Sequence, residues 1–426
     1  MGDVVKHLPA ILRADSARTV LRPFILEDPS TTDSPRTRRV IDRILALDEV
    51  GLRDGLIDFV ARMDDRHPDV DKVLARRNLE LANLLADRSP ATPDQLKLIA
   101  AYFSEEFSFE SAALFNPSVV AHPDQSGVEA GGLRILLSLR GIGEGHVSSL
   151  TFRTGTWHAD GALTLDDPSR YAVGPEVERT QSPEGEMVIR LSCGGAREIS
   201  ETVIYPFLPS QGRGIEDVRL VLFTEDDGAQ DYRGTYTAFN GTEVRQGLLR
   251  TEDFKTFEAR GVRGELHAGK GMALFPRRVD GRYMMLGRQD NENIWLVSSS
   301  AFDSWSGGVK IISPRWPWEF IQIGNCGSPI EIDEGWLVLT HGVGVARNYC
   351  MGASLLDKAD PSKVLARTAS PLLGPDDASR DGYVPNVVYS CGALLRGRTL
   401  LLPFGVSDSF ASFATVELDG LMKIMT

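Results

Sequence analysis

The segment GWLVLTH, residues Gly335–His341, is a short apolar strand that begins at a glycine turn and ends on a polar residue. Four other segments share this pattern: LRILLSLR at Leu133–Arg140, RGTYTAFN at Arg233–Asn240, GRYMMLGR at Gly281–Arg288 and RTLLLPFGVSD at Arg398–Asp408. The four segments from Arg233 onward begin roughly 50 to 60 residues apart, a spacing in the range of β-propeller blades. Equivalent strands of successive blades line one central axis. We therefore expect the polar strand ends to converge on one site: Arg140, Asn240, Arg288, His341 and Asp408.

Residues 111–426 are predicted to form a mainly β domain, a five-bladed β-propeller. Short alternating or apolar strands bounded by Gly, Asp and Pro follow one another after Phe115. The first repeat interval, from residue 133 to residue 233, is about twice as long as the others. Either one repeat there is degenerate, or an insertion lies around residues 155–200. The insertion is favoured, because residues 156–186 are rich in Asp, Gly, Pro and Ser.

Residues 1–110 are predicted to form a separate α-helical region. Ser34-Pro35 and Thr92-Pro93 are typical helix starts, with a capping residue followed by proline at the first helical position. Between and after them, apolar residues recur at helical spacing. These apolar stripes are expected either to pack on the β domain or to pair with a second subunit in a homo-oligomer.

The composition excludes several classes of protein. The chain has 426 residues, 42% of them hydrophobic, and a net charge of −13, which disfavours general nucleic-acid binding. No apolar run is long enough for a membrane span or a signal peptide, so no membrane partner and a cytoplasmic location are expected. The four cysteines form no CxxC pair and are predicted to be reduced and buried.

Two motifs resemble cofactor sites without the context that such sites need. Gly264 to Gly271 nearly spells a phosphate-binding P-loop, but the Ser or Thr after Lys270 is missing and a strand follows instead of a helix. The seven histidines have no metal-ligand spacing, so no metal and no organic cofactor is expected. The acidic pair Glu216-Asp217 precedes an apolar strand and could place a carboxylate at the propeller mouth, although most such pairs are solvated turns.

From Phe115 to its end the chain resembles the β-mannoside phosphorylases and hydrolases of glycoside hydrolase family 130. The motifs that carry this resemblance are Asn116-Pro117-Ser118, Leu139-Arg140-Gly141, Glu216-Asp217-Val218-Arg219, Lys270 to Pro276, Gly281 to Arg288, Ile294 to Leu296, Gly335 to Val343, Tyr349 to Asp357, Pro385 to Gly392 and Gly405 to Asp408. The family pattern Glu-Asp-Pro-Arg has lost its proline here. The family fold, a five-bladed propeller, agrees with the five strands counted from the sequence.

The resemblance implies a role for each matching residue. Asp217 would be the single catalytic acid, which protonates the glycosidic oxygen, in some family members through a sugar hydroxyl. Lys270, Arg288, His341 and Tyr349 match positions that hold inorganic phosphate. Positions near the mannosyl residue are matched by Asn116, Arg140 and Asp408, and Arg219 of the acidic motif is also expected to bind substrate.

These residue types favour phosphorolysis over hydrolysis. An inverting hydrolase needs an acid and a base with room for water, whereas a phosphorylase needs an acid and a cationic cradle for phosphate as its co-substrate. We expect the products to be α-mannose 1-phosphate and a free sugar. One alternative is a hydrolase whose base is Glu216, Asp381 or Glu144, and the other is a propeller that binds carbohydrate without catalysis. The linkage and the acceptor sugar remain open at this point.

Overall fold

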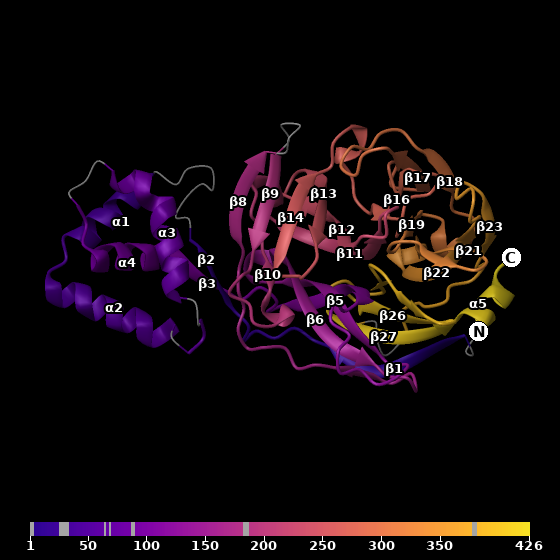
Figure 1. Cartoon of the computed structure of the whole chain (residues 1–426), viewed down its shortest axis with the longest axis horizontal. Coiled ribbons are helices and arrows are strands. Elements are labelled where there is room, and N and C mark those ends of the chain that lie inside the picture. The colour runs from indigo at the N-terminus through magenta and orange to yellow at the C-terminus, as the bar shows by residue number, and fades with distance from the viewer. Residues whose placement is uncertain are drawn as a thin grey trace.

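The computed structural model describes residues 4–24, 34–63, 65–67, 70–86, 90–181, 187–376 and 381–426. Figure 1 shows a cluster of helices on one side and a larger array of β-sheets on the other, with the first and last described segments together at the edge of the array, where Val5 pairs with Val416. Within the described residues, no helix is long and apolar enough to cross a membrane.

Four helices form the first part: α1 (Pro35–Leu45), α2 (Glu49–Met63), α3 (Val70–Leu85) and α4 (Pro93–Tyr102). Ser34 caps α1 by accepting a bond of 3.1 Å from the Thr37 amide, and Thr92 forms a capping box with Gln95 at the start of α4. Both predicted helix starts are therefore confirmed.

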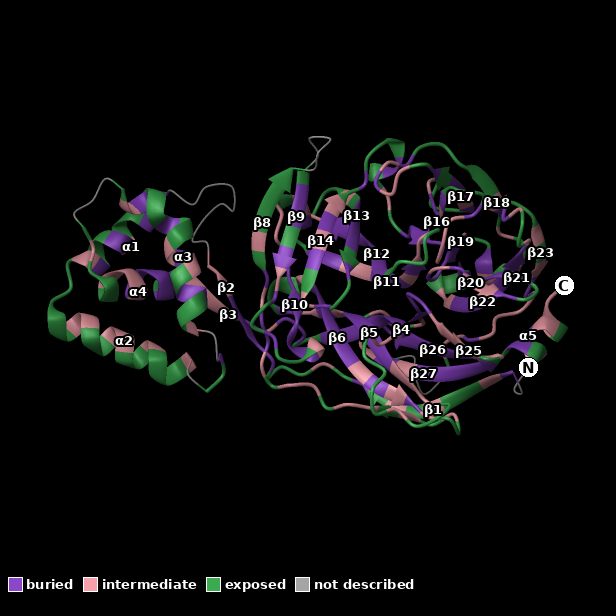
Figure 2. Cartoon of the chain, in the orientation of Figure 1, coloured by how far each residue is buried: buried purple, intermediate pink, exposed green. Residues whose placement is uncertain are grey.

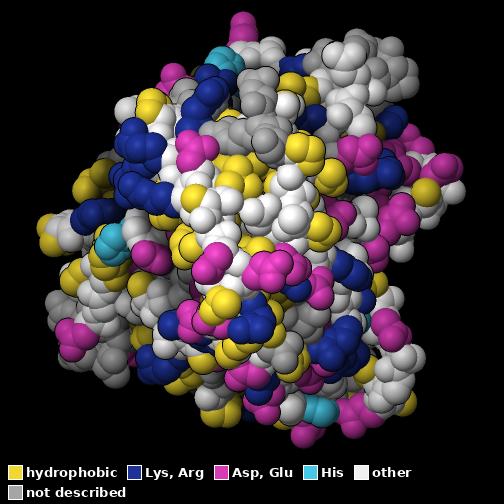
Figure 3. All heavy atoms as spheres, turned by 90° about the vertical axis from the view of Figure 1, so that its left-hand side faces the viewer, with side chains coloured by type: hydrophobic (Ala, Val, Ile, Leu, Met, Phe, Trp, Pro, Cys, Tyr) yellow, Lys and Arg dark blue, Asp and Glu magenta, His cyan; other side chains and the backbone are white. Residues whose placement is uncertain are grey.

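The apolar stripes of these helices pack mainly on one another. They enclose a small core of their own that contains Ile41, Ile44, Leu81, Leu84, Leu98, Ile99 and Phe103. The expectation that the stripes pack on the β domain or on a second subunit is therefore wrong for the inward faces, because four short helices suffice to cover one another. Helix α2 has no fully buried residue, as its colouring in Figure 2 shows. Figure 3 shows apolar, basic and acidic side chains mixed over this end of the molecule.

The expected helical region is wrong at its two ends. Strand β1 (Val5–Leu12) pairs antiparallel with β27 (Phe410–Glu417), and β2 (Val20–Pro23) pairs with β3 (Ser104–Phe107). Pro9 lies where the register of β1 shifts, between Leu8 and Ile11, so the missing N–H of proline falls at an irregularity in the ladder. The signals of a strand in this segment were weak, because most of its side chains are exposed or half-buried.

The described strands form five sheets, of 11, 5, 5, 4 and 2 strands. The largest sheet contains β4 (Ala113–Ala121), β5 (Leu133–Ile142), β6 (Ser148–Trp157), β7 (Leu163–Leu165), β8 (Glu176–Gln181), β9 (Met187–Ser192), β10 (Val203–Ile204), β11 (Gly214–Thr224), β12 (Gln230–Phe239), β13 (Val244–Thr251) and β14 (Thr256–Gly261). Its two halves are joined by one parallel residue pair, Gly214 with Ser148.

The other sheets follow in chain order. One contains β15 (Ala273–Leu274), β16 (Tyr283–Gly287), β17 (Ile294–Ser299) and β18 (Val309–Ile312), and the next β19 (Gln322–Asn325), β20 (Ile330–Ile332), β21 (Gly335–Val343), β22 (Tyr349–Leu356) and β23 (Val364–Arg367). The last contains β24 (Val388–Tyr389), β25 (Leu394–Arg396), β26 (Thr399–Val406), β27 and β1, and helix α5 (Leu418–Ile424) follows it. The protein is therefore mainly β, with few helices.

The five predicted strands are all present as β5, β12, β16, β21 and β26, and each has a neighbouring strand on both sides. The long first interval contains the hairpin β8–β9, whose strand β9 pairs with the outer strand β14. The extra residues therefore extend one sheet edge, which agrees with an insertion. Residues 182–186 of the predicted insertion lie outside the described residues.

The cores lie within and between the sheets, where buried residues concentrate (Figure 2). The four cysteines are buried and form no disulfide with one another, as predicted. Two buried arginines, Arg18 and Arg153, meet the fully buried Glu110 at 3.1 and 2.5 Å. Because Arg18 lies before the helices and Glu110 after them, this charged group fixes both ends of the helical region to β6.

Candidate active site

One cavity of about 230 Å³ is lined by all nine residues that the sequence singled out for substrate, phosphate and catalysis. These residues are Asn116, Arg140, Asp217, Arg219, Lys270, Arg288, His341, Tyr349 and Asp408. They come from strands or loops of every large sheet. Residues up to about 290 positions apart in the chain therefore share one site, as the repeat of strands predicted.

Backbone strain concentrates at this cavity. Asn116 in β4 and Asp217 in β11 both have positive φ, 49° and 52°, and each lies where the register with the next strand shifts. Arg347, with φ 58°, and Asp408, with φ 51°, are two further lining residues in the left-handed region. Non-glycine residues avoid this region unless the surrounding structure holds them there, and such residues cluster at functional sites.

Asn116 and Arg140 hold the carboxylate of Asp217. The Asn116 side-chain amide donates to Asp217 Oδ1 at 2.8 Å. Arg140 Nη2 lies 2.6 Å from Glu216 Oε1 and its Nη1 lies 3.5 Å from Asp217 Oδ1, while Nε donates to Ser148 Oγ at 2.9 Å. Arg140 therefore separates two adjacent carboxylates and fixes the orientation of both.

Arg219 lines the cavity but uses its donors within the protein. Its Nε donates to the Cys326 carbonyl at 2.7 Å, its Nη1 to the Asp217 carbonyl at 2.9 Å and its Nη2 to the Tyr389 hydroxyl at 2.7 Å. The side chain is buried, so these bonds replace water. This geometry favours positioning of the strained Asp217 backbone over direct contact with sugar.

The opposite wall consists of Arg288 and His341. Both are buried, and Arg288 Nη1 lies 3.1 Å from His341 Nε2. Glycines leave the space for them: a Cβ on Gly324 would lie 2.4 Å from His341 Cε1 and 2.5 Å from Arg288 Cδ. Tyr389 meets the imidazole edge-on at 4.9 Å between ring centroids, and Tyr349 lies parallel to it at 6.1 Å. Lys270 completes the predicted phosphate set from an exposed position.

The buried histidine changes the expected charge of this wall. Burial, together with the neighbouring Arg288 and Arg219, holds the pKa of His341 well below its ordinary value. His341 is therefore neutral near pH 7, and the cationic cradle expected from the sequence takes its charge from Lys270 and Arg288. Because a guanidinium nitrogen can only donate, His341 Nε2 accepts from Arg288 Nη1 and the neutral imidazole carries its proton on Nδ1.

The three carboxyl groups have different pKa values. For Asp217, burial acts to raise the pKa, but Arg140, Arg219 and the Asn116 hydrogen bond outweigh it and lower the pKa below the usual value. Burial raises the pKa of Glu216, and burial with the charge of Asp217 raises the pKa of Asp408 to about 6. The electrostatic field of the site therefore keeps Asp217 ionised when no anion is bound.

Some sequence expectations do not match the cavity. Asn240 lies in the turn after β12, where its side chain accepts bonds from the amides of Thr242 and Glu243, and Thr237 of the same strand lines the cavity instead. The strand ends at Phe239, and residues an odd number of positions apart point to opposite faces of a sheet. Of the alternative bases, Asp381 and Glu144 are absent from the lining.

The sequence reasoning missed several lining residues, among them Arg347, Tyr389 and Gln322. Tyr389 stands in the quoted stretch from Pro385 to Gly392, but a tyrosine at a buried strand gives no functional signal on its own. Arg347 lies in the turn between β21 and β22, and only its positive φ reveals it. Among the residues described, no cluster of His, Cys, Asp and Glu could hold a metal ion.

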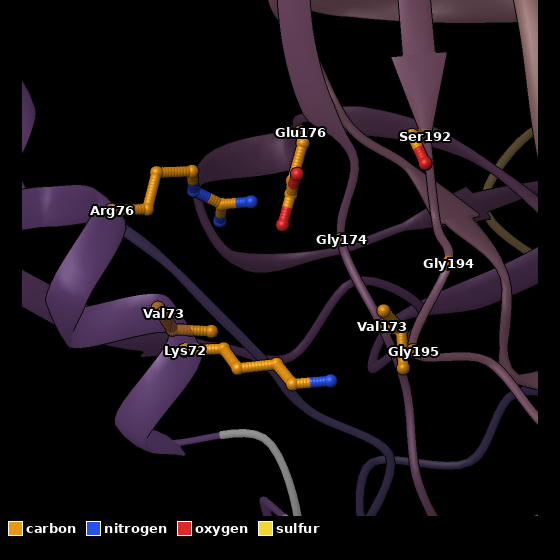
Figure 4. A pocket seen from close by; sticks show the side chains of 9 residues that line it. All are labelled: Lys72, Val73, Arg76, Val173, Gly174, Glu176, Ser192, Gly194 and Gly195. Carbon is orange, nitrogen blue, oxygen red and sulfur yellow. The ribbon is translucent and has the colours of Figure 1, made fainter.

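A second cavity, also of about 230 Å³, lies between helix α3 and the hairpin β8–β9. Figure 4 shows Lys72 and Arg76 pointing into it from the helix, with Glu176 on the facing side. None of the predicted site residues lines this second cavity. It lies between the helical region and the sheet that carries Asp217.

Known proteins match this chain over its β part. A family model described as beta-1,4-mannooligosaccharide phosphorylase matches residues 196–426. The chain is 34% identical over 229 residues to the beta-1,2-mannobiose phosphorylase of Listeria innocua serovar 6a, and this match covers 51% of the chain but only 62% of that enzyme. It is also 34% identical over 211 residues to the 1,2-beta-oligomannan phosphorylase of Thermoanaerobacter sp. strain X514, covering 48% of the chain and 69% of that protein.

A solved structure extends the similarity to most of the chain. The beta-1,2-mannobiose phosphorylase from Listeria innocua, in complex with beta-1,2-mannobiose, superposes with a TM-score of 0.50 and 24% sequence identity. The superposition covers 79% of this chain and 95% of that one. This likeness concerns the fold alone.

Proposed function

The chain belongs to glycoside hydrolase family 130, and we propose on this basis that it is an inverting phosphorylase that cleaves a β-mannoside with inorganic phosphate. The products would be α-mannose 1-phosphate and the shortened or free acceptor sugar. The observation that carries the proposal is the shared cavity, in which an acid held by Asn116 and Arg140 faces a wall with Lys270, Arg288 and His341.

Each group would have one task in the reaction. Lys270 and Arg288 would offset the charge of phosphate. His341 would hold Arg288 in place, and the Tyr349 hydroxyl would donate a hydrogen bond that aims one phosphate oxygen at the anomeric carbon. That oxygen forms the new bond to the carbon as the glycosidic carbon–oxygen bond breaks on the opposite face. The proton of Asp217 passes to the departing oxygen, directly or through a sugar hydroxyl, so the acceptor leaves as a neutral alcohol.

The low pKa of Asp217 is consistent with an acid that becomes protonated when its co-substrate, phosphate, binds. Arg140 and Arg219 lower this pKa in the structure. A phosphate dianion in the same cavity acts in the opposite direction, because a nearby negative charge favours the protonated carboxyl. Phosphate binding would therefore supply both the nucleophile and the conditions under which Asp217 holds its proton.

The geometry gives a hydrolytic base little support. Glu216 is the one alternative base that lines the cavity, and its carboxylate is paired with Arg140 at 2.6 Å. A carboxylate engaged in this way is poorly placed to activate water.

The five-bladed propeller belongs to the same proposal. It is supported by the five strand groups around β5, β12, β16, β21 and β26, by the single residue pair that joins the two halves of the largest sheet, and by the place of β1 beside β27. A division near residue 110 into a helical and a β domain is proposed with it.

Pairing of subunits through the helices is also proposed. It is supported by the exposed side chains of Val50 and Ile57 on α2. Comparing the solution mass of Ile57→Glu with that of the unchanged chain tests this pairing.

Phosphate dependence tests the reaction. Two relatives are named for β-1,2-linked mannosides and one for β-1,4-linked mannosides. We therefore choose β-1,2-mannobiose as the first substrate to test and β-1,4-mannobiose as the second. We expect α-mannose 1-phosphate with phosphate present and no turnover without it. Release of mannose at the same rate in both conditions would assign a hydrolase instead.

The acid is tested by Asp217→Asn, for which turnover should fall by about 10²- to 10⁴-fold while saccharide binding is retained. The matched control is Asp227→Asn, in the exposed turn that follows the same strand. A chain that binds mannobiose but turns nothing over, in wild type as in the variant, would identify a carbohydrate-binding propeller.

A further inference from the structure

Two aromatic rings are stacked on the surface beside the active-site cavity. The ring centroids of His146 and Tyr383 lie 5.7 Å apart with an angle of 26° between the ring planes. His146 is exposed, and 69% of Tyr383 is accessible. Neither residue belongs to the set predicted from the sequence, and neither lines the cavity itself.

The pair connects the two turns that carry mannosyl-site residues. His146 lies in the turn between β5 and β6, two residues before Ser148, whose hydroxyl accepts from Arg140 Nε at 2.9 Å. The amide of Tyr383 donates to Ser409 Oγ at 3.1 Å, directly after Asp408. Val384, the next residue, lines the cavity. The stacked rings therefore lie on the rim of the cavity, tied on one side to Arg140 and on the other to Asp408.

A saccharide bound as proposed would point its acceptor end toward this rim. The wall assigned to phosphate consists of Arg288 and His341, which are at most 7% accessible. With phosphate against that wall, the mannosyl unit lies inside and the next sugar lies toward the open side. The cavity of about 230 Å³ is smaller than the roughly 300–1,000 Å³ of sites for drug-sized ligands. With phosphate and the first sugar units inside a cavity of this size, a third sugar unit would lie on the rim.

An exposed ring stack suits a sugar and suits an anion poorly. Ordering two side chains at the surface costs conformational entropy, and these rings bury little area in return. A pyranose presents one face of C–H groups, which packs on an aromatic face in the same way as other apolar surface. The outward face of Tyr383 offers such a surface, and a large exposed aromatic beside a pocket indicates a contact site.

We propose that His146 and Tyr383 form a distal acceptor subsite that binds the third sugar of the substrate, so that the enzyme prefers mannooligosaccharides of three or more units over the disaccharide. The proposal rests on the proposed function, because it assigns a sugar to the same cavity. It adds a specificity-determining pair that acts on substrate length and takes no part in bond cleavage.

The test compares saccharide length in wild type and Tyr383→Ala. Affinity for β-linked mannobiose and mannotriose is measured by titration calorimetry, and kcat/KM for both is measured with phosphate. In wild type we expect mannotriose to exceed mannobiose by about 3- to 10-fold, the range of one aromatic contact. In Tyr383→Ala this ratio should fall to about 1, and Tyr383→Phe should restore it because the ring remains.

Tyr102→Ala removes another exposed tyrosine, in α4 of the helical region, and should keep the wild-type ratio. A wild-type ratio near 1, or an equal loss for both sugars in Tyr383→Ala, would overturn the proposed subsite. The titrations do not depend on turnover, so a protein that binds mannotriose better than mannobiose through Tyr383 without phosphorolysis would contradict the proposed reaction but not the subsite.

Discussion

Gly324→Ala places one methyl group against the wall that is assigned to phosphate. Gly324 in β19 pairs with His341 in β21, and its backbone leaves room for both His341 and Arg288. The added Cβ would lie 2.4 Å from His341 Cε1 and 2.5 Å from Arg288 Cδ. Non-bonded carbon atoms approach to about 3.5–4.0 Å, so each side chain must move by about 1 Å. The substitution changes no charge and no hydrogen-bonding group.

A displacement of about 1 Å in a positioning group can cost about 10²-fold in rate, which corresponds to roughly 2.7 kcal/mol. We expect kcat/KM for phosphate to fall by about this factor. Overpacking of the buried wall should also cost about 1–3 kcal/mol of folding stability. The affinity for mannobiose should change much less, because Asn116, Arg140 and Asp217 lie on the other wall.

The assay is steady-state phosphorolysis of mannobiose over a range of phosphate concentrations, with thermal unfolding measured in parallel. Gly261→Ala is the matched control: an added Cβ there meets no atom within 4 Å, and the residue lies in β14 away from the cavity. A folded Gly324→Ala protein whose kcat/KM for phosphate stays within about twofold of wild type would refute the assignment of Arg288 and His341 to the phosphate wall.

Three further predictions follow from charge and burial. The pKa of Asp408 is raised to about 6, so its protonated form stabilises the fold below about pH 4, and this stability is lost as the pH rises through 6. Asp408→Asn should therefore be more stable than wild type at pH 7–8 by about 1–3 kcal/mol. Equal urea midpoints for the two proteins across this pH range would contradict the prediction. Glu110→Gln leaves buried Arg18 and Arg153 without a counter-charge and should lower the free energy of unfolding by about 3–5 kcal/mol. A loss below about 1 kcal/mol would contradict the role of these two ion pairs in holding the helical region to β6. Sulfate has a constant charge near pH 7, so its binding should raise the low pKa values of Asp217 and His341, and the protein should take up protons. Calorimetric binding enthalpies that do not vary with the ionisation enthalpy of the buffer would exclude this coupling.

The sequence predicted which residues share the cavity better than it predicted their protonation states. The polar ends of repeated strands could be found because alternation and spacing are visible in the chain, which is how Arg140, Arg288 and Asp408 were identified. The prediction for Asn240 failed because β12 ends at Phe239, so Asn240 lies in the following turn, where its side chain accepts from the Thr242 and Glu243 amides. The neutral state of His341 depends on burial by residues distant in the chain, and no local pattern reveals it.

Two other features lay beyond sequence reasoning for different reasons. Strand β1 contains a proline and pairs with a segment at the far end of the chain, so its neighbours in sequence say nothing about its partner. Arg347 lines the cavity and has a left-handed backbone conformation that glycine usually adopts. An arginine at this position in the sequence does not predict that conformation. Long-range pairing and strained turns both depend on the completed fold.

The pairing of β1 with β27 also sets an order of events during synthesis. Roughly 400 residues separate the two strands, and a ribosome adds about 5–20 residues per second, so β1 waits for tens of seconds before its partner exists. During that interval the first strand is an unpaired edge that other nascent chains can join. A chain that stops before residue 410 cannot acquire this pairing at all. Shortening from the C-terminus should therefore abolish refolding well before it removes any residue that lines the cavity other than Asp408.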